Sequence, residues 1–334
     1  MALDLTPWFV GGGAQHSPEV ARLLAYAATS GAEGIVEPTS LAVKAQTTPN
    51  GTVSVRPGAA LILNRYAGGT QQTYVLRNPS STSITIPATG STGSRTDAII
   101  ARVLDPQYEG AAPPDPVGFN YARLERIASV PSNLKNISQL GLTYPAVLLA
   151  KITIPASTGT ITNGMITDLR DVAIPRTQDV WRPRAMATPD TEVLTASPTS
   201  VGEYFPNNGG PQSIDIPTWA TRAQIRCEWL SVRYAAGNAF GQAWVEYGPY
   251  QASSQRERST QKFQFDTPAA NNVSRAHWTV VDDVYIPAAY RGTEQLFVPK
   301  AQRLGGVTNS ISLDGVSGMS LQVRFLEAAD PSTT

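Results

Sequence analysis

The chain has 334 residues, a length that fits two domains or one large β domain. Charged residues make up only 16 % of it, while Gly (27) and Pro (26) are abundant. This composition is typical of short strands joined by many turns, and it argues against a coiled coil or a long helical bundle. Lys plus Arg (26) equals Asp plus Glu (26), so the chain lacks the positive excess that binding to nucleic-acid phosphates requires.

The sequence shows no sign of insertion into a membrane. No apolar run approaches the roughly 18 residues that span a bilayer. The first residues, Met1-Ala2-Leu3-Asp4, have neither the basic region nor the apolar core of a signal peptide, so we expect synthesis in the cytoplasm of the producing cell. The single cysteine, Cys227, excludes an intrachain disulfide, and stability must come from packing or from partner chains.

A helix of about 12 residues is predicted after Ser17, which can cap it, with Pro18 in the first position and Gly31 as a stop. One face of this helix is apolar and is formed by Val20, Leu23, Leu24, Ala27 and Ala28. A helix this short is not stable alone in water, so the apolar face should dock on another surface. That surface is either the core of the same domain or a neighbouring subunit. The candidate docking residues are Val20, Leu23 and Leu24.

Strand signals follow the helix. Apolar or alternating runs bounded by Gly, Pro, Asn and Ser occur at 52–56, 61–63, 73–76, 83–86, 98–104 and 146–154. The proline-rich stretch 105–118 is expected to be an exposed excursion. Residues 1–174 are therefore predicted to form one helix plus a small β barrel or sandwich.

A second β-rich block is predicted after a linker. Residues 175–190 contain several prolines and no periodicity, which indicates a stiff linker. In 223–229 and 319–325 apolar and polar residues alternate, and further strands are expected near 241–247, 260–265, 277–286, 294–301 and 308–313. Residues 191–330 are therefore predicted to form a jelly-roll-like β-sandwich, and the whole chain is mainly β.

The sequence offers little material for catalysis. Its only histidines, His16 and His277, have no close ligand spacing to Cys227, so we predict no metal site, no cofactor and no catalytic residue. Cys227 lies on the apolar side of an alternating strand, where a small buried side chain is the ordinary explanation. Asp282 and Asp283 are adjacent in a strand and therefore point to opposite faces.

Two sets of residues are candidates for surface roles. Aromatic rings near turns of the second block can stack on sugars or anchor an interface, although core packing is the alternative for each; they are Trp219, Tyr247, Tyr250, Trp278 and Tyr290. Asp168 and Arg170 are two positions apart, share a strand face and are expected to form a structural ion pair or to meet a neighbouring chain. Arg95, Asp97 and Arg102 offer a similar arrangement.

An ordered series of segments resembles the minor tail proteins of long-tailed bacteriophages (siphophages). The series runs from ARLLAYAATSGAEGIV (21–36) through LAV (41–43), VSVRPGAA (53–60) and RTDAIIARV (95–103) to ITDLR (166–170), and covers roughly residues 15–175. Proteins of this kind lie in the baseplate or tail tip and carry or form receptor-binding appendages. The second block is similar only in general terms to the terminal sandwich of tail-fibre proteins.

The resemblance implies a structural virion protein of the phage tail tip or baseplate. Because tail tips have threefold or sixfold symmetry, a homotrimer is the expected assembly. The expected partners are further copies of the chain, other tail or baseplate proteins and a host cell-surface glycan. The N-terminal part would dock or trimerise, and the C-terminal sandwich would contact neighbouring chains or the host.

Two alternatives remain open from the sequence. One is a sandwich-type glycan hydrolase or esterase of the cell envelope, for which the available acids are Asp215, Glu228, Glu246, Asp266, Asp282 and Asp283. The other is a carbohydrate-binding module unrelated to phage.

Overall fold

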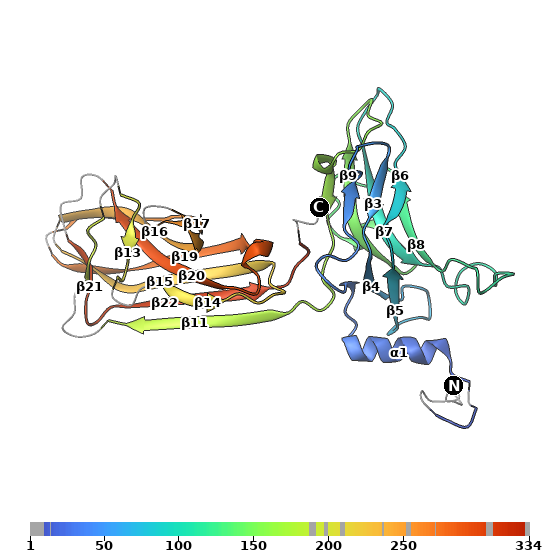
Figure 1. The fold of residues 1–334 in the computed structure, drawn as a ribbon, viewed down its shortest axis with the longest axis horizontal. Helices are drawn as coiled ribbons and strands as arrows, with labels where there is room; N and C mark the ends of the chain where they lie inside the picture. The colour runs from blue at the N-terminus through green and yellow to red at the C-terminus, as the bar shows by residue number, and fades with distance from the viewer. Residues whose placement is uncertain are drawn as a thin grey trace. The chain divides into compact units, whose positions relative to one another are not determined.

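A computed structural model describes residues 10–13, 15–186, 192–196, 200–207, 211–235, 237–251, 255–270, 272–304 and 310–330. The chain divides into two compact units (Figure 1). The N-terminal unit comprises Met1–Pro175 and Ala328–Thr334, and the C-terminal unit comprises Arg176–Glu327. The fold is mainly β, as the sequence predicts, with a single α-helix in the described ranges.

Three antiparallel sheets form the N-terminal unit. The first contains β1 (Gly34–Ile35), β4 (Gly58–Leu63) and β5 (Thr73–Asn78) in that order. The second contains β2 (Val43–Ala45), β3 (Thr52–Val55) and β6 (Thr82–Thr85). The third has the order β10 (Ile166–Asp168), β9 (Ala146–Ile154), β7 (Arg95–Val103) and β8 (Ala122–Ile127).

The central strands β7 and β9 are buried on both faces. One face joins the main core of this unit, to which Val53 and Ile62 from the other two sheets contribute. The opposite face packs under the segment that holds Leu134 and the short 3₁₀ helix η1 (Ile137–Leu140). This double burial explains why both strands read as continuous apolar runs and not as alternating ones. A second 3₁₀ helix, η2 (Asn163–Met165), leads directly into β10.

The helix α1 spans Pro18–Thr29 and lies beside β5 (Figure 1). Ser17 caps it by accepting a hydrogen bond from the backbone N–H of Glu19 at 3.1 Å. At the other end Ser30 adopts a left-handed conformation (φ 52°), and the N–H of Gly31 bonds to the carbonyl of Tyr26. The helix therefore begins and ends where the sequence predicts.

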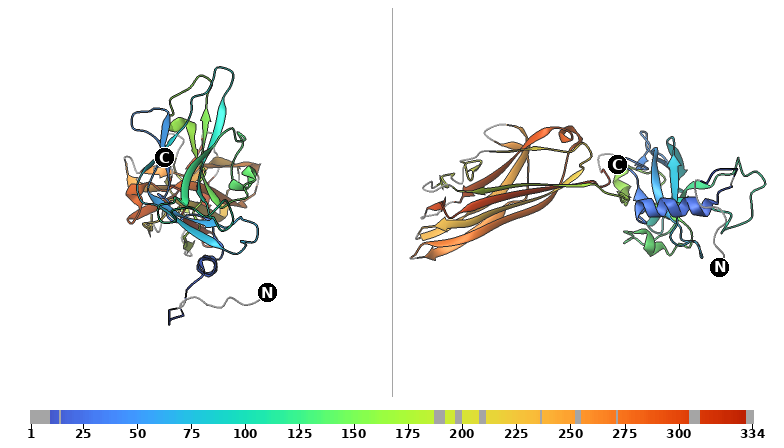
Figure 2. Two further views of the ribbon diagram at one scale, coloured as in Figure 1. Left: turned by 90° about the vertical axis from the view of Figure 1, so that its right-hand side faces the viewer. Right: turned by 90° about the horizontal axis from the view of Figure 1, so that it is seen from below.

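Two antiparallel sheets form the C-terminal unit (Figure 2). One has the order β11 (Thr177–Ala185), β22 (Gly318–Leu326), β15 (Arg222–Tyr234), β21 (Ile311–Leu313) and β12 (Glu192–Val193), with β19 (Ser274–Tyr285) also paired to β15. The other has the order β13 (Glu203–Tyr204), β20 (Glu294–Arg303), β16 (Gly237–Tyr250) and β17 (Arg256–Ser259); β14 (Gln212–Asp215) also pairs with β20, and β18 (Phe263–Ala270) with β16. A third 3₁₀ helix, η3 (Ala288–Tyr290), follows β19.

The core of the C-terminal unit lies between these sheets. Cys227 and Trp229 of β15, Leu321 of β22 and Phe297 of β20 are all fully buried. The alternation read from the sequence therefore separates the core face of β15 and β22 from their outer face. The ring of Trp278 stacks on Phe265 with centroids 4.1 Å apart, which joins β19 of one sheet to β18 of the other.

The prediction that residues 175–190 form a linker is wrong for most of these residues. Residues Thr177–Ala185 form β11, which pairs with β22 over its whole length. As an edge strand, β11 exposes most of its side chains on both faces, so it carries no apolar alternation. An edge position also tolerates Pro183, which lacks a backbone N–H. Residues 187–190 lie outside the described part of the chain.

The chain passes between the units twice, at 175–176 and at 327–328. Arg176 and Glu327, the first and last residues of the C-terminal unit, are joined by hydrogen bonds that we call the clamp. The guanidinium of Arg176 donates to the Glu327 carboxylate at 2.6 and 2.8 Å, and each backbone N–H donates to the other residue. Beyond this clamp, Ala329 packs against the core of the N-terminal unit.

The carboxylate of Asp97, on β7, is fully buried and has three partners. It pairs with Arg95 and Arg126, each at 2.9 Å, and accepts the N–H of Ser129 at 3.1 Å. Because an uncompensated buried charge is costly, these contacts act as a unit. They fix the loop after β8 against the central sheet.

Replacing Asp97 with alanine should destabilise the N-terminal unit by about 3 kcal/mol, because two arginines and one N–H lose their acceptor together. Denaturant unfolding followed by circular dichroism measures this loss. The control is Arg123→Ala on the neighbouring strand β8, whose ion pair to Glu125 is long (3.9 Å) and partly exposed; it should cost less than about 1 kcal/mol. Equal effects would contradict the role given to Asp97.

We expect the contribution of the clamp to the stability of the fold to be lost in acid. Burial alone would raise the pKa of Glu327, but hydrogen bonds from Arg176 outweigh it and leave that pKa below its ordinary value. A lowered pKa means that the clamp stabilises the fold fully above the unfolded-state value of about 4.3 and loses this contribution as the pH falls through the folded-state value. Glu327→Gln should therefore lower the thermal unfolding temperature at neutral pH, and its difference from wild type should shrink in acid. A difference that stays constant with pH would show that the charge of Glu327 is not involved.

Candidate functional site

Helix α1 turns its polar side toward its own unit and its apolar side outward. Arg22 is the buried residue of the helix. Residues two apart on an α-helix are about 200° apart around its axis, so Arg22 lies nearly opposite Val20. Leu23 and Leu24 are 40 % and 46 % exposed, and Val20 is half-buried. Docking of the leucines on the domain's own core, one of the two expectations from the sequence, is therefore wrong.

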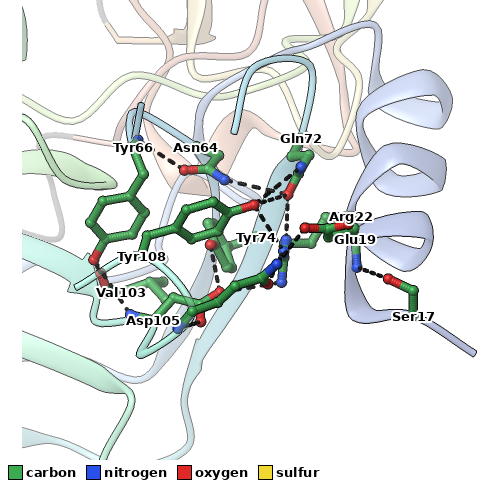
Figure 3. A network of polar contacts seen from close by, with 11 residues as sticks. Ser17, Glu19, Arg22, Asn64, Tyr66, Gln72, Tyr74, Val103, Asp105 and Tyr108 are labelled. Atoms are coloured by element: carbon green, nitrogen blue, oxygen red, sulfur yellow. Dashed lines mark hydrogen bonds and ion pairs between the residues drawn. The ribbon is translucent and has the colours of Figure 1, made fainter. Parts of the chain in front are cut away.

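Arg22 anchors the helix through a polar network (Figure 3). Its Nε donates to Oε1 of Gln72 at 2.6 Å. One terminal nitrogen pairs with Asp105 at 3.2 Å, and the other donates to Gln107 at 2.8 Å and to the Tyr108 hydroxyl at 3.4 Å. Glu19, one turn earlier, accepts a hydrogen bond from Gln107. Both charged side chains of α1 therefore have partners.

Aromatic rings surround the guanidinium of Arg22. It lies 5.1 Å from the ring centroid of Tyr74 and 5.7 Å from that of Tyr108, distances at which a cation is attracted to a ring. The hydroxyl of Tyr74 donates to Asp105 at 2.8 Å. Burial, and then this hydrogen bond, raise the pKa of Tyr74 far above its ordinary range, so the residue stays a neutral donor. Asp105 thus binds α1 and β5 at once.

The network continues through the loop that follows β7. The ring of Tyr66 stacks on Tyr108 at 5.2 Å, and its hydroxyl donates to Glu109 at 2.7 Å. Burial is the main reason that the pKa of Tyr66 rises to about 12, while the same hydrogen bond and that from Arg102 lower the pKa of Glu109. The start of the predicted excursion at 105–118 is therefore a fixed part of the site. Residues 110–118 are mostly exposed, as expected.

A groove of about 450 Å³ lies beside α1. Pro18 and Arg22 of the helix line one part of it, and Tyr74, Val75 and Leu104 line others. Val75 is 67 % exposed, an unusual position for a large aliphatic side chain of a strand. Near the helix, the exposed apolar surface of this unit consists of the groove and of the two leucines of α1.

Most of the predicted surface aromatics are core residues. Tyr247, Trp278 and Tyr290 are buried, so their rings are not available to stack on a sugar. Trp219 packs partly against the core, and the guanidinium of Arg176 lies 5.3 Å from its ring. Tyr250 alone of this set is strongly exposed, at 60 %. The sequence did not single out Trp181, which is 66 % exposed on β11, within the segment predicted as a linker.

The predicted ion pairs have partners inside the chain. Arg95 pairs with the buried Asp97, and Asp168 pairs with Arg170 at 2.6 Å. Arg170 also donates to the backbone carbonyls of Pro38 and Ser40. Arg102 pairs with Glu109 at 2.7 Å and with Glu125 at 3.4 Å. These contacts fix loops to the central sheet of the N-terminal unit.

The acids proposed for hydrolysis have separate partners or are exposed. Their partners are Arg226 for Glu228, Lys300 for Glu246, Arg222 for Asp283 and the Gln261 backbone N–H for Asp282. Asp215 and Asp266 are exposed. Cys227 is buried, which raises the pKa of its thiol, and His277 accepts the Ser231 N–H at 3.1 Å.

The described ranges contain no group of three or more His, Cys, Asp or Glu side chains that could hold a metal ion. Within the same ranges, no helix has the length and apolar character needed to cross a membrane.

No family model matches the chain, and no curated protein matches it. Among solved structures, the infectious bursal disease virus Gx strain is 12 % identical, with 88 % of this chain and 67 % of that chain covered at a TM-score of 0.24. The VP2 subviral particle of the same virus is also 12 % identical, with 89 % and 77 % covered at a TM-score of 0.23. TM-scores this low do not establish a shared fold, so nothing about the function of this chain follows from them.

Arg22→Ala should loosen α1 even though it does not lower the intrinsic helix propensity, since alanine is the best helix former. Loss of hydrogen bonds to a charged group, each contributing about 2 kcal/mol, should speed amide exchange in α1 by roughly tenfold or more. Hydrogen exchange followed by mass spectrometry measures this, with the amides of β7 as the unaffected reference. The matched control is Arg123→Ala on β8, which also removes an arginine but none of the contacts to α1, and it should leave exchange in α1 nearly unchanged. If both variants behave alike, Arg22 is not the anchor.

Proposed function

We propose that this chain is a structural subunit of a virion, in the tail tip or baseplate of a long-tailed phage. In this proposal it assembles as a homotrimer through the outward face of α1 and docks on other tail proteins. Its C-terminal sandwich faces neighbouring chains or a glycan of the host surface. The protein then acts through its surfaces and not through a reacting group.

The observation that carries the proposal is the exposed apolar face of α1. Leu23, Leu24 and the half-buried Val20 are neighbours at helical spacing, and Ala27 and Ala28 extend the same face. The helix is fixed to its unit from the other side, by Arg22. Its leucines are therefore not needed to attach it to its own core. An exposed apolar face of this kind marks an interaction surface.

The charge of α1 supports a second copy of the chain as the partner. Glu19 and Arg22 are the charged residues of the helix, and both are engaged in the network beneath it. The outward face is consequently uncharged. Identical faces of this kind can pack together without like-charge repulsion, as a symmetric assembly requires.

The resemblance to tail proteins supports the location in the virion. The matching segments 53–60, 95–103 and 166–170 fall on β3 and β4, β7 and β10, which build the N-terminal unit. This unit also contains α1. Assembly and docking on the tail would thus use one part of the chain and leave the other free for outward contacts.

Light scattering after size exclusion tests the assembly. Wild-type protein should have about three times the 35.6 kDa mass of one chain. The double variant Leu23→Glu and Leu24→Glu should have the mass of one chain, because charges on all copies would meet at the interface and glutamate still favours a helix.

The matched control is Leu230→Glu, which changes an equally exposed leucine (40 %) on β15 and should leave the trimer intact. A wild-type mass of one chain at the highest soluble concentration would contradict the trimer. A trimer that persists in the double variant would contradict the role of α1.

A further inference from the structure

The outer face of the sheet formed by β11, β22, β15 and β19 carries an exposed indole. Cross-strand pairing aligns Trp181 with Gln322, Gln322 with Arg226, and Arg226 with Val281. Residues paired in this way point to the same face, so the four side chains form a row across four strands. Trp181 stands at one end of the row, and its Nε1 donates to the hydroxyl of Ser320 at 2.6 Å. This bond orients the ring on the edge strand.

The charges on this outer face neutralise one another. Asp179 pairs with Arg324 at 3.1 Å, Arg222 with Asp283 at 2.9 Å, and Arg226 with Glu228 at 2.7 Å. The amide side chains of Gln224 and Gln322 lie among these pairs. The face therefore has many hydrogen-bonding groups and no excess of either sign.

A groove of about 540 Å³ is cut into the same face. Gln322 and Arg324 of β22, Gln224 and Arg226 of β15, and Asp283 of β19 line it. Gln261, from the segment between β17 and β18 of the other sheet, lines it as well and is bound by its backbone N–H to Asp282 at 2.6 Å. Trp181 is not one of the lining residues, but its cross-strand partner Gln322 is.

We propose that this face binds a neutral carbohydrate. The indole of Trp181 stacks on the apolar face of one sugar ring, and the amides and paired charges of the groove hydrogen-bond to the hydroxyls of the next. A neutral ligand fits because a charged one would meet no compensating charge. This proposal rests on the proposed function in one respect, since it takes the C-terminal unit as the part that faces the host surface.

The other classes of ligand fit this face less well. Nucleic acid and acidic polymers require unpaired basic side chains, and the arginines of this face are paired with carboxylates. A protein partner would be expected to meet a central apolar cluster, whereas Trp181 and Val281 stand at opposite ends of the row.

An array of immobilised oligosaccharides tests the proposal with the full chain. It carries neutral glycans of glucose, galactose and N-acetylglucosamine, together with sulfated and sialylated glycans as acidic probes. Wild-type protein should bind at least one neutral glycan and none of the acidic ones. Titration calorimetry with the best soluble glycan then gives its affinity for each variant.

Trp181→Ala should weaken this affinity by roughly tenfold or more, as expected for loss of a stacking anchor. Trp181→Phe, which keeps an aromatic ring, should retain most of it. The control is Tyr250→Ala, on the other sheet and 60 % exposed, which should bind as wild type does. The proposal is overturned if no glycan is bound, if only acidic glycans are bound, or if Trp181→Ala binds as tightly as wild type.

Measuring the mass of the same samples separates this proposal from the proposed function. Wild-type protein that is trimeric but binds no glycan would overturn only the carbohydrate site. Protein with the mass of one chain that binds glycan through Trp181 would overturn only the trimer.

Discussion

The position of Arg22 decides which face of α1 is buried in the N-terminal unit and which face is exposed. A short amphipathic helix ordinarily buries its apolar face against its own domain, because that face supplies most of its stability. In α1, the stability comes from the opposite, polar face, through the hydrogen bonds of Arg22 and the aromatic rings beside its guanidinium. The leucines of α1 are thereby left exposed. The same network fixes the start of the loop after β7, so the helix and this loop are held in one geometry.

The C-terminal unit follows a different principle. Its apolar and aromatic residues are concentrated between two sheets, while the outer face of one sheet is covered by ion pairs and amides. Exposed ion pairs of this kind add little to stability. Their effect is to keep the face hydrated and neutral around Trp181. One unit therefore exposes an apolar helix face, and the other exposes a polar, neutral sheet face; the proposed functions assign assembly to the first and glycan binding to the second.

The sequence predicts the elements whose signals are local. The cap at Ser17, the apolar runs of β7 and β9, and the alternation around Cys227 all appear in the structure as expected. The role of Arg22 could not be read in this way, because its partners lie about 50 and 85 positions further along the chain. Strand β11 was missed since an edge strand exposed on both faces has no apolar period. Burial of Tyr247 and Trp278 depends on the facing sheet, which no local pattern reveals.

The clamp between Arg176 and Glu327 has a consequence for how such chains diversify. The sandwich lies between two segments of the N-terminal unit, and its two ends, Arg176 and Glu327, are in contact. An insertion with adjoining ends can be exchanged for another module without rebuilding its host, because only two neighbouring junctions must be rejoined. Under the proposed function, exchange of this unit would alter the surface that faces the host and leave the assembly surface on α1 unchanged.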